Sequence, residues 1–304
     1  MRLRDEKSQW IGFILALVAA TFWGVSGAFV QFLFNHRGIN TEWLVTVRLL
    51  VSGFILLTMA YVRKGPTVWH IWQNRVDTAE ILLFGIVGIT SVQYTYFAAI
   101  EHSNAATATV LQYVGPVLIV LYFALRNRKW PTPFQYLAVF MATVGTFLLV
   151  THGRFDRLSI SGPALFWGLG AALGLAFYTI QPHRLLTRYD PMIITGWGML
   201  LGGMGFSFIH APWDISGRWD LYTYLSTVMV IVLGTVIAFS FFLQAVRLIG
   251  AETASLLSSV EPLSATVLSI VWLGVSFDPI DWLGGLLILS TVVLLTLKKS
   301  EVAY

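Results

Sequence analysis

A stretch of 29 residues that occurs twice constrains the fold of this chain more than any other feature. Residues 88–116 read GITSVQYTYFAAIEHSNAATATVLQYVGP, and residues 234–262 read GTVIAFSFFLQAVRLIGAETASLLSSVEP. Aligned without a gap at an offset of 146, the two stretches share eight residues and end on the matched prolines Pro116 and Pro262. A repeat of this length indicates that the chain is built from two related units.

A second match sets the extent of the units. The tripeptide Phe22-Trp23-Gly24 recurs as Phe166-Trp167-Gly168 at an offset of 144. We therefore interpret residues 1–151 as the first copy and residues 152–304 as the second, within one integral membrane domain.

The composition places the chain in a membrane. Hydrophobic residues make up 57%, charged residues only 11%, and the mean hydropathy is +0.74, whereas soluble domains carry about 25% charged residues. The chain has no cysteine, which excludes disulfides, thiolate metal sites and a nucleophilic thiol. The net charge of +4 comes from small cationic clusters between apolar segments, so we expect the lipid bilayer and no nucleic acid as a partner.

Ten apolar segments approach the length of about 20 residues that a membrane-spanning helix needs. They are predicted at residues 9–34, 41–62, 79–101, 104–126, 132–151, 160–184, 191–211, 222–247, 251–274 and 279–298. Five fall in each copy, and the connections are too short for a separate soluble domain.

An odd number of spans in each copy requires the second copy to enter the membrane upside down relative to the first. With the N-terminus inside, 14 of the 19 Lys and Arg residues lie on the inner side and 4 on the outer side, while Arg48 lies within a span. This bias follows the positive-inside rule and predicts that both termini are cytoplasmic. The predicted fold is an all-α membrane protein with ten transmembrane helices in two inverted five-helix repeats.

Inverted repeats are typical of secondary transporters, in which the substrate site lies near the bilayer midplane between the copies. The sequence also resembles the EamA family of the drug/metabolite transporter superfamily. The resemblance rests on the two Phe-Trp-Gly starts, Val47-Arg48-Leu49 and Val260-Glu261-Pro262, and it covers nearly the whole chain. It implies ten helices in two inverted halves, no nucleotide or metal, and usually the export of amino acids or related metabolites from a bacterial cell across its cytoplasmic membrane.

Two charged residues inside spans are candidates for coupling or gating. Glu261 lies about ten residues into the ninth span, where a carboxylate is costly and is a functional-site hypothesis by default. It would either carry a proton or brace the helix at Pro262. Arg48 would either reach back to the interface or attract a substrate carboxylate. The first copy has Gly115 where the second has Glu261, so a symmetric pair of carboxylates is not expected.

Aromatic, amide and hydroxyl groups at depth are the candidate lining of a substrate cavity. We predict this role for Trp23, Gln93, Tyr94, Gln112, Tyr113, Trp167, Tyr178 and Ser259. Packing between helices or contact with lipid is the alternative for each of them. Pro116 and Pro262 lie in mid-span at matched positions, and we predict that both kink their helices and take part in gating.

An enzyme is not expected. Intramembrane catalysis would need paired carboxylates or a histidine cluster at depth. The pair in Asp278-Pro279-Ile280-Asp281 fits a helix N-cap, and the six histidines lie in predicted loops and helix ends. We predict a secondary transporter without cofactor or metal that moves small organic metabolites by alternating access, as a monomer or homodimer. An importer of a cationic or quaternary amine, with its aromatic residues as a cation-π cage, and an uncoupled facilitator remain the alternatives.

Overall fold

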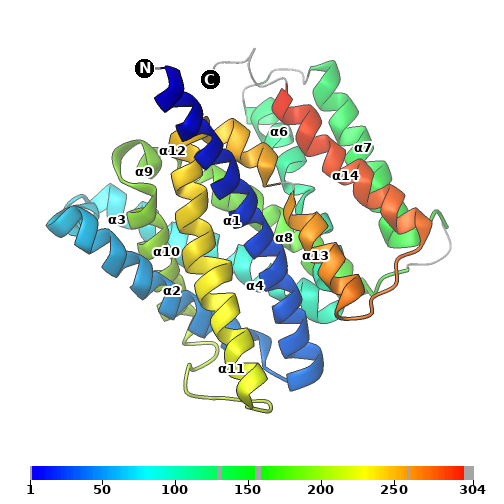
Figure 1. Ribbon diagram of the computed structural model, residues 1–304, viewed down its shortest axis with the longest axis horizontal. Coiled ribbons are helices and arrows are strands. Elements are labelled where there is room, and N and C mark those ends of the chain that lie inside the picture. The colour runs from blue at the N-terminus through cyan, green and yellow to red at the C-terminus, as the bar shows by residue number, and fades with distance from the viewer. Residues whose placement is uncertain (1, 127, 129–131, 155–158, 259, 298–304) are drawn as a thin grey trace.

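The computed structural model describes residues 2–126, 128, 132–154, 159–258 and 260–297, and every regular element within these residues is helical (Figure 1). Residues 1–151, here called the first half, contain α1 (Arg2–Arg37), α2 (Thr41–Lys64), η1 (Gly65–Gln73), α3 (Arg75–Leu83), η2 (Phe84–Ile89), α4 (Thr90–His102), α5 (Ala105–Gln112), α6 (Gly115–Arg126) and α7 (Pro133–Thr151). Residues 152–304, the second half, contain α8 (Gly162–Ile180), α9 (His183–Arg188), α10 (Pro191–Phe206), α11 (Leu221–Val228), η3 (Met229–Ile237), α12 (Ala238–Leu257), α13 (Val260–Val271) and α14 (Pro279–Leu297).

Ten apolar helical segments are present in the described residues. Seven are long and apolar enough to cross a membrane, and three further apolar helices are shorter. The predicted all-α fold with ten helices is therefore confirmed. One expected boundary is wrong, because α12 continues through Gly250, where the sequence suggested a break between the eighth and ninth spans. The matched residue in the first half is Asn104, whose side chain accepts a hydrogen bond from the Thr107 N–H and starts α5 as an N-cap, and glycine cannot do this.

Side-chain caps start the second and third spans of each half. Asn40 caps α2 by accepting from the Trp43 N–H at 2.7 Å, and Asp190 caps α10 by accepting from the Met192 N–H at 3.0 Å. Asn74 caps α3, and Asp220 caps α11. Each cap satisfies one of the backbone donors that a helix start leaves free, so matching polar residues fix matching helix starts in the two halves.

The helices of the two halves exchange partners. α1 packs along α12, and α8, which occupies the matching place in the second half, packs along α4, the counterpart of α12. The second spans α2 and α10 pack on each other, and the last spans α7 and α14 do the same, as Figure 1 shows for the red and green helices. Gly145 and Gly284 allow the last contact, because a Cβ on either glycine would lie 2.7 Å from the carbonyl oxygen of the other.

Two irregular features also occur at matching places. The π-helical turns η2 and η3 widen the third and eighth spans. The next span in each half is interrupted. In the first half α5 ends at Gln112 and α6 starts at Gly115, and in the second half α12 ends at Leu257 and α13 starts at Val260. In each case the proline lies in the first turn after the break, where its missing N–H costs no hydrogen bond. Pro116 and Pro262 therefore accompany interrupted helices, in the places where kinks were predicted.

Candidate functional site

Arg48 is buried in the middle of α2. Its side chain is 5% exposed, and its Nε–H donates to the Thr235 hydroxyl at 2.7 Å. The guanidinium carbon lies 4.8 Å from the ring centre of Phe97. A buried cation needs such contacts because its hydration is lost. Arg48 therefore does not reach back to the interface, and it is held by a residue from each half.

The turn η3 places Thr235 for this contact. The Thr235 hydroxyl donates to the Val230 carbonyl, five residues earlier, at 3.0 Å, and its oxygen is then oriented to accept from Arg48. A wider helical turn is common at functional sites, because it frees carbonyls and re-aims side chains. Directly after η2, at the start of α4, the Thr90 hydroxyl donates to the Gly85 carbonyl at the same distance, 3.0 Å, without an arginine partner among the described residues.

Glu261 lies in the first turn of α13, just after the break in the ninth span. The Tyr113 hydroxyl donates to the Ser258 carbonyl at 2.8 Å, and Glu261 Oε2 lies 3.3 Å from the same hydroxyl. Tyr113 ends α5 and is itself buried. The two interrupted helices thus meet, and Tyr113 of the first half contacts both the Ser258 carbonyl and the Glu261 carboxylate of the second.

Arg48 and Glu261 lie within electrostatic range of each other, and Tyr96 lies within range of both. Among the described residues they form no direct ion pair. The Tyr96 hydroxyl is hydrogen-bonded to the Thr109 hydroxyl at 2.8 Å. A cation from the first half and a carboxylate from the second therefore face the same buried region without neutralising each other by contact.

Glycines of α1 make room for this region. A Cβ on Gly24 would lie 2.4 Å from the Glu261 carbonyl oxygen, and a Cβ on Gly27 would lie 2.9 Å from the Tyr96 hydroxyl. Real Cβ contacts of this length do not occur, so only glycine permits α1 to approach so closely. The glycine of the Phe-Trp-Gly motif therefore positions α1 directly against the break that carries Glu261.

The other residues predicted for the cavity lie in separate places. The Tyr94 hydroxyl donates to Glu42 at 3.2 Å and its ring packs edge-on against Trp167. Trp23 packs between two phenylalanines of α12, and Tyr178 stacks on Phe84. The structure brings together Arg48, Tyr113, Glu261 and Pro262, and the remaining assignments stay predictions.

Four of the predicted positions lack a side-chain hydrogen bond in the described residues or lie outside them. Within the described residues, the side chains of Gln93 and Gln112 take part in no hydrogen bond. Ser259 lies outside the described residues. The Trp23 indole N–H is buried without a hydrogen-bond partner in the described part of the chain. A buried donor left unpaired carries a free-energy cost, which a ligand or a water molecule at that place would remove.

Sequence reasoning missed three residues of this region. Thr235, Tyr96 and Phe97 all contact or face Arg48. Thr235 had a usable signal, because it follows the repeat glycine Gly234 in an otherwise apolar run. Tyr96 and Phe97 had none that separated them from the neighbouring aromatic residues, since depth along a helix does not reveal which face points inward.

Contacts between the halves close both ends of the bundle. At one end, Arg37 lies 3.5 Å from Asp220, and the Trp43 indole donates to the Pro212 carbonyl at 2.9 Å. The Thr223 backbone N–H, together with the Arg37 cation, lowers the pKa of Asp220. At the other end, the buried Asp77 accepts hydrogen bonds from Arg184 and from Arg188.

A cluster of metal-ligand type joins the last helices of the two halves. His152 Nε2 lies 2.7 Å from Asp281, its Nδ1 lies 3.5 Å from Asp278, and one ligand atom from each residue falls within 4.8 Å of the others. This geometry could hold a cation. Asp281 also accepts from the Asp278 N–H at 2.9 Å, as expected of a helix cap, so the contacts already account for the cluster as a joint between α7 and α14.

Comparison with known proteins gives consistent matches over the whole chain. Residues 10–151 and 162–297 each match the EamA-like transporter family. The inner membrane transporter YicL of Salmonella typhimurium is 42% identical over 95% of this chain and 96% of its own length. The threonine/homoserine exporter RhtA of Escherichia coli is 23% identical over 96% and 94%. A solved crystal structure shares the fold, with a TM-score of 0.63 at 18% identity over 97% of this chain and 98% of its own.

Proposed function

This chain belongs to the EamA-like transporter family, and we propose that it is a secondary transporter that exports amino acids or related zwitterionic metabolites. It is a multi-pass inner membrane protein and not an enzyme, as the sequence predicted. We propose further that transport is outward, that it proceeds by alternating access of two inverted halves, and that both termini lie in the cytoplasm.

One observation carries the choice of substrate: the buried Arg48 of one half and the partly buried Glu261 of the other lie within electrostatic range and form no direct ion pair among the described residues. A zwitterion offers a carboxylate to an arginine and an ammonium group to a carboxylate. Arg48 uses only Nε in the hydrogen bonds of the described residues, which leaves its two terminal nitrogens for a bidentate carboxylate contact. A substrate that neutralises both charges would then connect the two halves.

The alternating-access part of the proposal is supported by the exchanged helix packing and by the matching breaks and π-helical turns. Rocking of one inverted copy against the other needs such an interface around a central site. The RhtA relative is named for threonine and homoserine export, and these two amino acids are the first substrates to test.

A cationic or quaternary amine is the alternative substrate, and Arg48 argues against it. A fixed buried cation at the centre repels a ligand that has a positive charge and no carboxylate. Of the aromatic residues predicted for the cavity, Tyr94 packs against Trp167, whereas Trp23 packs against Phe239.

Exchange of radiolabelled L-threonine and L-homoserine in liposomes that contain the purified protein tests the proposal. Removing one partner of a buried charge pair costs roughly 2–5 kcal/mol. The pair here is the proposed contact between Arg48 and the substrate carboxylate, so Arg48→Gln should reduce exchange by roughly tenfold or more. Arg75→Gln is the matched control, because Arg75 is exposed and has no ion pair among the described residues. Choline exchange in the absence of any amino-acid exchange would contradict the proposal.

A further inference from the structure

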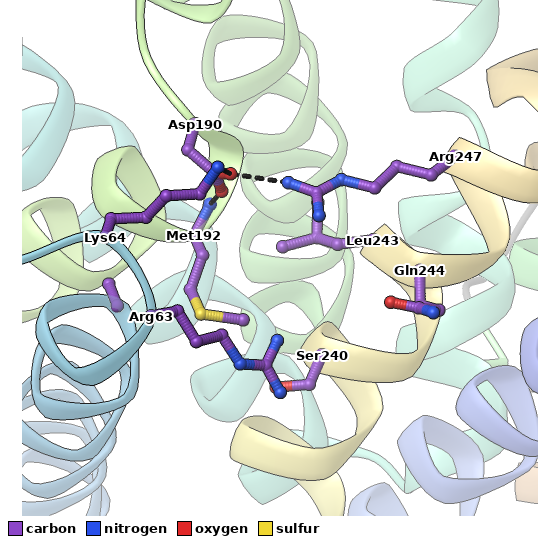
Figure 2. A pocket seen from close by; sticks show the side chains of 9 residues that line it. Arg63, Lys64, Asp190, Met192, Ser240, Leu243, Gln244 and Arg247 are labelled. Carbon is purple, nitrogen blue, oxygen red and sulfur yellow. Dashed lines mark hydrogen bonds and ion pairs between the residues drawn. The ribbon is translucent and has the colours of Figure 1, made fainter.

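A pocket opens between α2 of the first half and α10 and α12 of the second (Figure 2). It encloses about 390 Å³ of empty space, including the part that is open to solvent. Arg63, Lys64 and Arg247 bring three cations to its wall, and Asp190 brings one carboxylate. The charged lining therefore carries an excess of two positive charges.

The carboxylate is already engaged. Asp190 Oδ2 lies 3.6 Å from Lys64 Nζ and accepts a hydrogen bond from Arg247 at 2.5 Å. Arg63 makes no ion pair or hydrogen bond within the described part of the chain, and Figure 2 shows its guanidinium group extending across the pocket toward Ser240. The Ser240 hydroxyl is buried and lacks a hydrogen-bond partner among the described residues. One cation and one hydroxyl are thus free to bind an anion.

The pocket and Arg48 share the helix α2. At mid-helix, α2 touches η3 through the contact between Arg48 and Thr235. About 22 Å further along α2, at a rise of about 1.5 Å per residue, Arg63 and α12 line the open space of the pocket. Ser52, one turn after Arg48 on α2, has a fully buried hydroxyl without a partner among the described residues. An unpaired hydroxyl therefore lies on α2 between Arg48 and the pocket, and a second one, that of Ser240 on α12, lines the pocket.

We propose that this pocket is an anion-recruiting site at the cytoplasmic mouth of the transporter, which takes the carboxylate end of the substrate before it reaches Arg48. The cytoplasmic placement and the passage to Arg48 rest on the proposed function. A cleft lined by charges of one sign raises the local concentration of the opposite charge, so the mouth selects carboxylates over amines on the side from which an exporter loads.

The absence of native cysteine makes the local potential measurable. A single cysteine replaces Gln244, which is exposed and lines the pocket. Its rate of reaction is compared for an anionic and a cationic methanethiosulfonate of similar size, added to inside-out vesicles. We expect an anion-to-cation rate ratio roughly threefold or more above that of a free thiol, and a fall of that ratio toward the free-thiol value in Arg63→Gln.

Two controls keep the test decisive. Arg75→Gln removes the same charge outside the pocket and should leave the ratio unchanged. Leu243→Cys, at a partly exposed position of the same pocket wall, replaces the reporter position if Gln244→Cys does not fold. An anion-to-cation ratio that is equal in the parent, Arg63→Gln and Arg75→Gln backgrounds would overturn the proposal, as would labelling only from the external side.

Protection experiments identify the occupant. L-Threonine should slow labelling of the Gln244→Cys thiol, and choline should not. If labelling is slowed by phosphatidylglycerol in the vesicles, compared with phosphatidylcholine vesicles, and not by added L-threonine, the pocket binds a lipid headgroup and its role in loading is overturned. If the parent protein shows the expected labelling ratios and exchanges no threonine, the central site alone is contradicted. If the parent exchanges threonine and Arg63→Gln leaves the ratio unchanged, only the mouth is contradicted.

Discussion

The two helix breaks occupy matching places in the halves and differ in charge. In the first half the break is followed by Gly115-Pro116, and in the second by Glu261-Pro262. Packing explains the difference. A Cβ on Gly115 would lie 2.9 Å from Leu175 Cδ2 and 3.0 Å from the Ala172 carbonyl oxygen, so α8 leaves no room for a side chain there.

The second break solves the same packing problem in another way. There the broken helix keeps the Glu261 side chain, and Gly24 on the neighbouring helix α1 lets the backbone of α13 approach closely. The comparison teaches that the repeat conserves the interruption of the backbone while only one break can present a carboxylate to the buried region. A carrier with one such group has a single candidate for coupling, Glu261, and no symmetric partner for it.

The largest expected effect comes from filling the space beside the second break. Gly24→Ala should lower the thermal unfolding midpoint in detergent by more than Gly168→Ala, its counterpart in the first half. The Gly24 Cβ would meet backbone atoms of α13, whereas the Gly168 Cβ would meet the Leu111 side chain, which can shift. Overpacking of a side-chain contact typically costs about 1–3 kcal/mol. Equal midpoints for the two variants would show that the breaks are packed alike.

The next effect concerns coupling to protons. If Glu261 carries a proton, Glu261→Gln should keep exchange of substrate at equal pH and lose the acceleration of flux by an imposed pH gradient. If Glu261 only braces the break, the glutamine should accept the Tyr113 hydrogen bond and behave like the parent in both assays. Flux measured in liposomes with and without a gradient separates the two. A parent protein that does not respond to the gradient would exclude coupling before any variant is made.

Much of the fold was predictable from the sequence, because apolar length and the offset of 146 depend on many residues at once. Glu261, Arg48 and the two prolines were identified for the same kind of reason, since charges and prolines inside spans are rare and costly. The remaining cavity assignments were less accessible. Tyr94 and Tyr96 are two residues apart on one helix, yet the first contacts Glu42 and the second faces Arg48. Helix rotation decided between them, and rotation is set by packing with helices distant in sequence.

The π-helical turns offer a matched pair of threonines for a smaller effect. Thr235 and Thr90 each donate to a carbonyl five residues earlier, and among the described residues only Thr235 contacts Arg48. A hydrogen bond to a charged group contributes about 1.5–3 kcal/mol, so Thr235→Val should reduce threonine exchange by roughly tenfold or more. Thr90→Val should leave it close to the parent. A loss of similar size in both variants would mean that the turns, and not the contact to Arg48, govern exchange.

The smallest expected effect is that of the hydroxyl that joins the breaks. Tyr113→Phe keeps the buried ring and removes the donor to the Ser258 carbonyl and the contact to Glu261. A single hydrogen bond contributes about 0.5–1.5 kcal/mol, so the unfolding midpoint should fall slightly and exchange should fall a few-fold. Tyr122→Phe is the control, because Tyr122 is exposed and its hydroxyl contacts only Arg126 among the described residues. The first break has no carboxylate of its own, and Tyr113 connects it to Glu261 by a side-chain contact. The loss should therefore be larger when the pH gradient drives flux than at equal pH. If Tyr113→Phe matches Tyr122→Phe in both assays, the two breaks act independently and the carboxylate is positioned by the second half alone.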